Sequence, residues 1–202
     1  SFSRVCISGE GTCNHLSIHQ LASTALHFGH TQVNIGHAGR YTQCNLALSG
    51  SLVRQDTVIN LQEADAFTQC HGVYTPQQKM VLDTHVEVNH RVPNTVSKLA
   101  YRGVVAAGGI GIFNGLVRVA KNAIGTDSDV QSRALLLGQG AEVYAKPELI
   151  IDADAVKCSH GNSIGQLDET QLFYLQSRGV ALPQARTVLT QAFVTELLDV
   201  VQ

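Results

Sequence analysis

The stretch DADAVKCSHGNSIGQLDETQLFYLQSRG, residues Asp152–Gly179, separates two kinds of sequence. Before it, short runs of alternating apolar and polar residues are divided by Gly, Asn, Asp and Ser, a pattern typical of strands and turns. After it, apolar residues recur at helical spacing. Within it, side chains two residues apart on extended backbone point the same way. We therefore expect Val156, Cys158 and His160 to share one face, and we look for the functional site there.

The region before Asp168 predicts a mainly β structure. In the segment HLSIHQL, Leu16 and Ile18 are expected on one face, with His15 and His19 on the solvent side. No window in this region has helical periodicity, which excludes a doubly wound α/β sheet because its parallel strands need helical crossovers. An antiparallel sandwich and a solenoid of stacked short strands remain. The scarcity of two-residue hairpin signals favours the solenoid, and no strict repeat period is visible.

The end of the chain predicts two helices. Asp168 with Gln171 three residues later forms a capping box, and Gly179 is a typical helix stop. Pro183 fits the first turn of a second helix, whose apolar residues recur at helical spacing. This apolar stripe must be covered, either by the rest of the chain, which we favour, or by another subunit. Its members are Ala185, Val188, Leu189, Ala192, Phe193, Leu197, Leu198 and Val201.

Composition limits the partners and the compartment. The chain has 202 residues, of which 44% are hydrophobic and 15% charged, and its formal net charge is −2. It therefore lacks the basic footprint that nucleic acid or an anionic membrane requires. Five cysteines without a CxxC pair favour a reducing compartment, and no apolar run approaches the roughly 20 residues of a membrane span. We expect a cytoplasmic protein that binds neither nucleic acid nor membrane, and we expect further residues before Ser1.

Two motifs invite a chemical interpretation. The run GGIGIFNG, Gly108–Gly115, lacks the Gly-Lys-Ser/Thr of a phosphate loop and does not open onto a helix, so we interpret it as turns and bulges. None of the nine histidines has Cys or carboxylate partners at zinc-like spacing. His160 stands where strand gives way to loop, and a neutral imidazole there could bind iron or move protons. Cys158 is interpreted as an inert, buried thiol.

The segment Ala155–Gly179 closely resembles the signature of SufD, within the SufB/SufD family of iron–sulfur cluster assembly proteins. The matching core is VKCSHG, then GQLD, then QLFYL-x-SRG, and the resemblance extends backward through KPELII and FNG. It implies a mainly β fold, a right-handed parallel β-helix over residues 1–161. It also implies a short α-helical C-terminal region over residues 162–202.

The same resemblance implies a non-catalytic scaffold that pairs with SufB and docks the ATPase SufC through its C-terminal helices. An iron–sulfur cluster would form transiently in the complex, with no cofactor held stably by this chain, and the isolated chain could form a homodimer. The implied candidates for the SufB interface and cluster assembly are His160, also a possible metal ligand, and Cys158. The candidates for SufC docking are Leu172, Phe173, Leu175, Arg178, Phe193 and Leu197.

A second class of function remains open, a β-helix carbohydrate-active enzyme such as a lyase or hydrolase. Hydrolysis of a glycosidic bond needs two carboxylates that flank the bond. The available acidic pairs are Asp152 with Asp154 and Asp127 with Asp129. Their positions in turn-like sequence favour structural roles.

Overall fold

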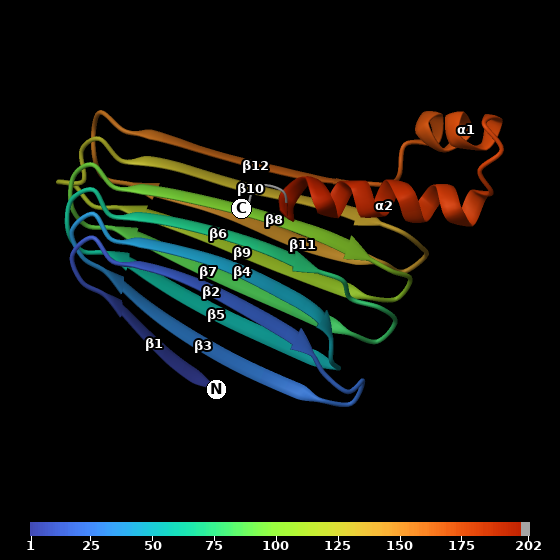
Figure 1. The fold of residues 1–202 in the computed structure, drawn as a ribbon, viewed down its shortest axis with the longest axis horizontal. Coiled ribbons are helices and arrows are strands. Elements are labelled where there is room, and N and C mark those ends of the chain that lie inside the picture. Colours follow the sequence, from blue (N-terminus) through green and yellow to red (C-terminus); the bar gives the residue numbers. More distant parts are fainter. Residues whose placement is uncertain (199–202) are drawn as a thin grey trace.

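The computed structural model describes residues 1–198, over which the chain forms twelve strands followed by two helices (Figure 1). Val201, which the sequence placed in the apolar stripe, lies outside the described residues, and so does the end of the predicted C-terminal region. The elements are β1 (Phe2–Ile7), β2 (Thr12–Gln20), β3 (Leu26–Ile35), β4 (Arg40–Ser49), β5 (Leu52–Leu61), β6 (Phe67–Tyr74), β7 (Val81–His90), β8 (Val96–Val105), β9 (Ile110–Val119), β10 (Asp127–Leu136), β11 (Glu142–Ile151), β12 (Lys157–Gly165), α1 (Glu169–Ser177) and α2 (Leu182–Leu198).

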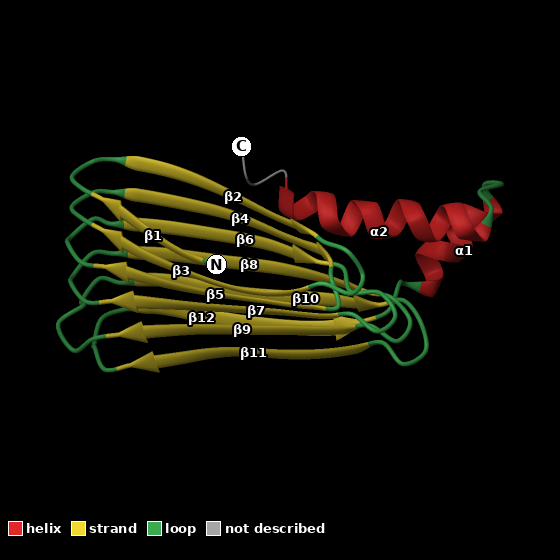
Figure 2. Ribbon diagram, turned by 90° about the horizontal axis from the view of Figure 1, so that it is seen from below, coloured by secondary structure: helices red, strands yellow, loops and turns green. Residues whose placement is uncertain are grey.

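The strands alternate between two sheets. The odd-numbered strands form one sheet in the order β1-β3-β5-β7-β9-β11, and the even-numbered strands form the other in the order β12-β10-β8-β6-β4-β2. Every strand pairs in parallel with the strand one coil away, so the chain winds through about six coils (Figure 2). The predicted parallel β-helix is confirmed, and parallel pairing excludes the antiparallel sandwich. β12 continues to Gly165, four residues beyond the boundary expected at 161.

Aromatic rings and glycines share the space between the sheets. Tyr74 pairs in register with Gly103, and Tyr101 pairs with Gly72, so each ring lies beside a residue without a side chain. A Cβ atom on either glycine would overlap the neighbouring ring. Phe113 stacks on Tyr101 with 4.5 Å between ring centres. These glycines therefore make the narrow interior wide enough for its largest side chains.

The run GGIGIFNG differs from the prediction of turns and bulges. Its first two glycines lie in the turn before β9, but the strand begins at Ile110 and includes the rest of the run. Gly111 faces inward, where a Cβ would lie 2.5 Å from the Tyr74 ring. The glycine is thus explained by a large interior neighbour rather than by a bend in the backbone.

The predicted orientation of β2 is wrong. His15 and His19 face the interior, whereas Leu16 and Ile18 face outward and are 60% and 54% exposed. A hydrogen bond of 2.7 Å joins His15 Nδ1 to the hydroxyl of the buried Tyr41. Strict alternation identifies two faces but does not say which one is inside. The pairing of β2 with β4 determines which face is inside, and the interior of the first coils contains histidines as well as apolar residues such as Val33.

The structure confirms Asp168 as the N-cap of α1 and Gly179 as its end, although in the described part of the chain no hydrogen bond links Gln171 back to Asp168 as a capping box requires. The Asp168 carboxylate accepts a 2.7 Å hydrogen bond from the backbone N–H of Thr170. At the other end Gly179 has a φ of 85°, and the N–H of Val180 donates to the carbonyl of Leu175, which closes the helix. Local capping chemistry therefore defines both ends of α1.

Part of the apolar stripe of α2 packs on the chain itself, with Ala185 buried and Val188 49% exposed. α2 lies against the outer face of the even-numbered sheet, where Glu196 accepts from Arg102 at 3.0 Å (Figure 1). The Arg102 guanidinium also lies over the Phe193 ring, 4.8 Å from its centre, and Leu197 is buried. In the described part of the chain, neither helix is long and apolar enough to cross a membrane.

Substitution of Gly72 tests the interior packing. Gly72→Ala places a methyl group against the Tyr101 ring and is expected to lower the free energy of unfolding by about 1–3 kcal/mol, as overpacking does. The measurement is urea denaturation followed by circular dichroism. Gly165→Ala is the matched control, because a Cβ there meets no atom within 4 Å. Equal stability of the two variants would contradict the packing account.

Candidate functional site

The last coil leaves two strand edges open. Within residues 1–198, β11 pairs with β9 alone and β12 pairs with β10 alone. The N–H of Lys157 donates to the carbonyl of Thr126, on the side of β10. Because alternate residues of a parallel strand bond to opposite sides, the backbone groups of His160 and Asn162 face the open edge. This end of the solenoid is therefore a template for pairing with another strand.

His160 lies at the centre of this end. It pairs in register with Val130, which is fully buried, but His160 is exposed because no described coil covers it. Its Nδ1 lies 3.1 Å from the carbonyl oxygen of Pro147, on the opposite sheet. A carbonyl can only accept, so Nδ1 donates in this contact, and in the neutral form of the ring the lone pair is on Nε2. The contact holds the imidazole between the two sheets with Nε2 available to a metal or a proton.

Cys158 shares the inward face with His160, as the spacing predicted. It pairs in register with the buried Ser128 and is itself half-buried. Burial and the nearby carboxylate of Asp127 raise the pKa of the Cys158 thiol. The raised pKa keeps the thiol protonated at neutral pH, which makes the sulfur a poor nucleophile. This environment agrees with the interpretation of Cys158 as an inert thiol.

The six docking candidates on the helices divide by burial. Phe173 is 73% exposed and Arg178 is also exposed, so both are open to a partner. Leu172 and Leu197 are only 3% and 4% exposed, so they belong to the packing of this chain and are unsuited to docking unless a helix moves. The two partly buried candidates are Leu175 and Phe193. Sequence patterns missed Tyr174, which is exposed beside Arg178, with the guanidinium 5.4 Å from the ring centre.

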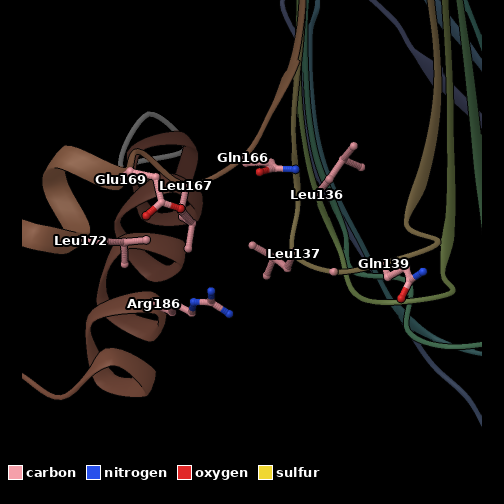
Figure 3. A pocket seen from close by; sticks show the side chains of 9 residues that line it. Leu136, Leu137, Gln139, Gln166, Leu167, Glu169, Leu172 and Arg186 are labelled. Atoms are coloured by element: carbon pink, nitrogen blue, oxygen red, sulfur yellow. The ribbon is translucent and has the colours of Figure 1, made fainter.

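A pocket of about 520 Å³ separates the helices from the solenoid. In Figure 3, Leu136 and Leu137 lie on the solenoid side, and Leu172 and Arg186 lie on the helices opposite them. The linker after Gly165 joins the helices to β12, and α2 contacts β6 and β8 of the even-numbered sheet.

The acidic pairs give no support to a carbohydrate site. Asp129 accepts from the Ser159 hydroxyl at 2.6 Å and from the Gln131 amide at 3.0 Å, so it bridges β10 and β12. A carboxylate engaged in this way has a structural role at the surface of the sheet. In the described part of the chain, no three side chains among His, Cys, Asp and Glu gather as a metal site.

Fold and open end together define a class of protein, a parallel β-helix with unpaired strand edges and a helical C-terminal region. Residues 1–193 match the family model described as "SUF system FeS cluster assembly, SufBD core domain". The chain belongs to this SufBD core family.

Three curated relatives illustrate the similarity. The chain is 34% identical over 173 residues to "Iron-sulfur cluster assembly protein SufD" of Escherichia coli strain K12, a match that covers 86% of this chain and 41% of the relative. It is 31% identical to "Protein ABCI7, chloroplastic" of Arabidopsis thaliana, over 96% of this chain and 41% of the relative. It is 30% identical to the SufBD family protein slr0076 of Synechocystis, over 98% of this chain and 44% of the relative. The resemblance to SufD is confirmed, and the chain spans less than half the length of these relatives.

Proposed function

We propose that the chain is a non-catalytic scaffold subunit in iron–sulfur cluster assembly. It would pair with SufB through the open end of the solenoid and dock SufC through its C-terminal helices. The iron–sulfur cluster would be transient cargo of the complex, with no cofactor held stably by this chain. The observation that carries the proposal is the pair of open strand edges around an exposed His160, in a member of the SufBD core family.

The open end suits a second solenoid. Two inward-facing residues of the last coil, Ile151 and Ile164, are 40% and 43% exposed at this end. A partner strand on each edge would pair the free backbone groups and cover these side chains, which stabilises by about 25 cal/mol per Å² of apolar surface buried. A related chain such as SufB fits this requirement. A second copy of this chain fits it as well, which supports a homodimer in isolation.

Pairing at this end would also change the surroundings of His160. An exposed imidazole would become enclosed between two subunits, with its Nε2 lone pair directed away from the Pro147 carbonyl. In that position Nε2 could ligate cluster iron or carry a proton during assembly. Other ligands would come from the partner, because no three metal-binding side chains gather in the described part of this chain. His160 would thus supply one part of a shared site.

The helices offer a separate surface for SufC. Phe173, Tyr174 and Arg178 are exposed on or beside α1, and α2 adds the exposed Val188. Aromatic residues and Arg are the side chains most enriched at the centres of protein interfaces. In Figure 1, α1 lies beyond the end of β12 and does not lie over the length of that strand. SufB and SufC could therefore bind at the same time.

All five cysteines are free, which suits a reducing compartment such as the cytoplasm. One relative is named as a chloroplastic protein, so related chains occur in more than one compartment. We propose a cytoplasmic location for this chain.

Proline at the open edge tests SufB pairing. Asn162→Pro removes a backbone N–H that faces the open edge of β12. We expect co-purification with co-expressed SufB to fall at least about tenfold. Asn162→Ala is the matched control because it shortens the same side chain and keeps the N–H. Thermal unfolding verifies that both variants fold. Co-purification of Asn162→Pro at the wild-type level would contradict pairing through this edge.

His160→Ala tests the shared site. The complex with SufB and SufC should still assemble, because the backbone edges remain, but its iron and acid-labile sulfide content should fall by about tenfold, as loss of a metal ligand or its support does. His37→Ala is the control, since His37 lies in the turn between β3 and β4. Wild-type cluster loading in His160→Ala would remove this histidine from cluster assembly.

Phe173→Asp tests SufC docking. Loss of the exposed ring and addition of a charge should weaken SufC binding by about tenfold or more, which corresponds to about 1.4 kcal/mol. Phe28→Asp is the control, because Phe28 is similarly exposed but lies on β3. Isothermal titration with SufC provides the measurement. Unchanged affinity of Phe173→Asp, or equal losses in both variants, would refute docking at α1.

A further inference from the structure

Two histidines meet inside the first coils, at the opposite end of the solenoid from His160. His19 of β2 and His27 of β3 both face inward, with 4.8 Å between ring centres and 44° between ring planes. The Nε2 atom of each is buried, and among the described residues neither has a hydrogen-bond partner. A buried polar atom without a partner lowers the free energy of unfolding by about 1–3 kcal/mol, so this pair of histidines requires a physical explanation.

A glycine beside the two histidines lets a third polar side chain approach them. Gly29 follows His27 on the same inward face of β3, and a Cβ on Gly29 would lie 3.0 Å from His27 Nε2. The same Cβ would overlap the side-chain oxygen of Gln55. The amide nitrogen of Gln55 donates to the Thr31 hydroxyl at 3.3 Å, which directs the oxygen toward Gly29. The Gln55 oxygen therefore lies where a Cβ on residue 29 would be, near His27 Nε2, and only glycine permits this close approach.

The local backbone also positions His19. The register between β2 and β4 shifts between His19 and Gln20, which marks a bulge at the end of the strand. Bulges of this kind redirect a side chain relative to the regular strand. Burial and the neighbouring His27 lower the pKa of His19, so its imidazole is neutral at pH 7 and keeps a lone pair.

The ring separation suits two ligands of one ion. Imidazoles bound to a tetrahedral ion at about 2.0–2.1 Å place their ring centres about 5 Å apart, close to the 4.8 Å observed between His19 and His27. Two nitrogens and an amide oxygen suit a first-row transition metal, whereas Ca²⁺ and Mg²⁺ prefer carboxylates and other oxygen ligands. A water alone could also bridge the two nitrogens, and an experiment with metal ions distinguishes the two occupants.

We propose that His19 and His27 bind one divalent first-row transition-metal ion, with the Gln55 side-chain oxygen as a third ligand and water completing the coordination. Only its two histidines belong to the residue types that form most protein metal centres. The described residues accordingly contain no cluster of three such side chains at this place. It is independent of the proposed role of His160, because it lies between β2, β3 and β5.

Titration of the metal-free chain with Zn²⁺ by calorimetry, and with Co²⁺ by visible absorption, tests the site. We expect one ion per chain, with affinity reduced at least about tenfold in His19→Asn and in His27→Asn. Gly29→Ala should weaken binding as well, because it keeps both imidazoles but its Cβ would displace the Gln55 oxygen. His30→Asn is the matched control, since His30 lies on the outward face of β3 and stacks on Phe2.

Circular dichroism and thermal unfolding establish that each variant folds. The absence of saturable binding to the folded wild-type chain would overturn the proposal and leave water between the two imidazoles. Wild-type affinity in both His19→Asn and His27→Asn would also overturn it, because the ion would then bind elsewhere.

Discussion

Backbone hydrogen bonding between successive coils is the interaction on which the rest of the structure depends. A strand such as β5 is bonded along its full length to β3 on one side and to β7 on the other. The same bonds fix which side chains enter the narrow interior, because a shift of one residue would exchange the two faces. Such a stack cannot satisfy its own last coil. The open edges of β11 and β12 are therefore a consequence of the fold and the basis of the proposed assembly.

The local features were predictable because short-range chemistry determines them. Asp168 and Gly179 mark the ends of α1 through hydrogen bonds that span at most five positions of the chain. The repeat was not visible because the coils differ in length. Leu52 lies beside Leu26, 26 residues earlier, whereas Glu142 lies beside Ile110, 32 residues earlier. The parallel β-helix therefore followed from the family resemblance, while the alternation of residues indicated only a β structure.

For the candidate site, the sequence predicted which side chains share a face but not which distant residues they contact. Residue spacing placed Cys158 and His160 on one face, but the contact of His160 with Pro147 joins strands from different sheets and has no signal in the sequence. Leu172 and Leu197 were docking candidates because they belong to apolar helix faces. The spacing of apolar residues does not reveal whether such a residue packs on its own chain. The contact between the His19 and His27 rings depends on the conformation of the turn between β2 and β3, which the spacing of residues in the sequence does not determine.

The central claim is that the open end of the solenoid binds a partner strand. Hydrogen–deuterium exchange of the chain, alone and with SufB, measures this directly, because a backbone amide exchanges slowly once it is hydrogen-bonded across an interface. We predict slower exchange in β11 and β12 in the complex, with the strongest effect at backbone amides that face the open edge, such as that of Asn162. Slower exchange confined to β1 and β2, with no change in β11 or β12, would contradict the account.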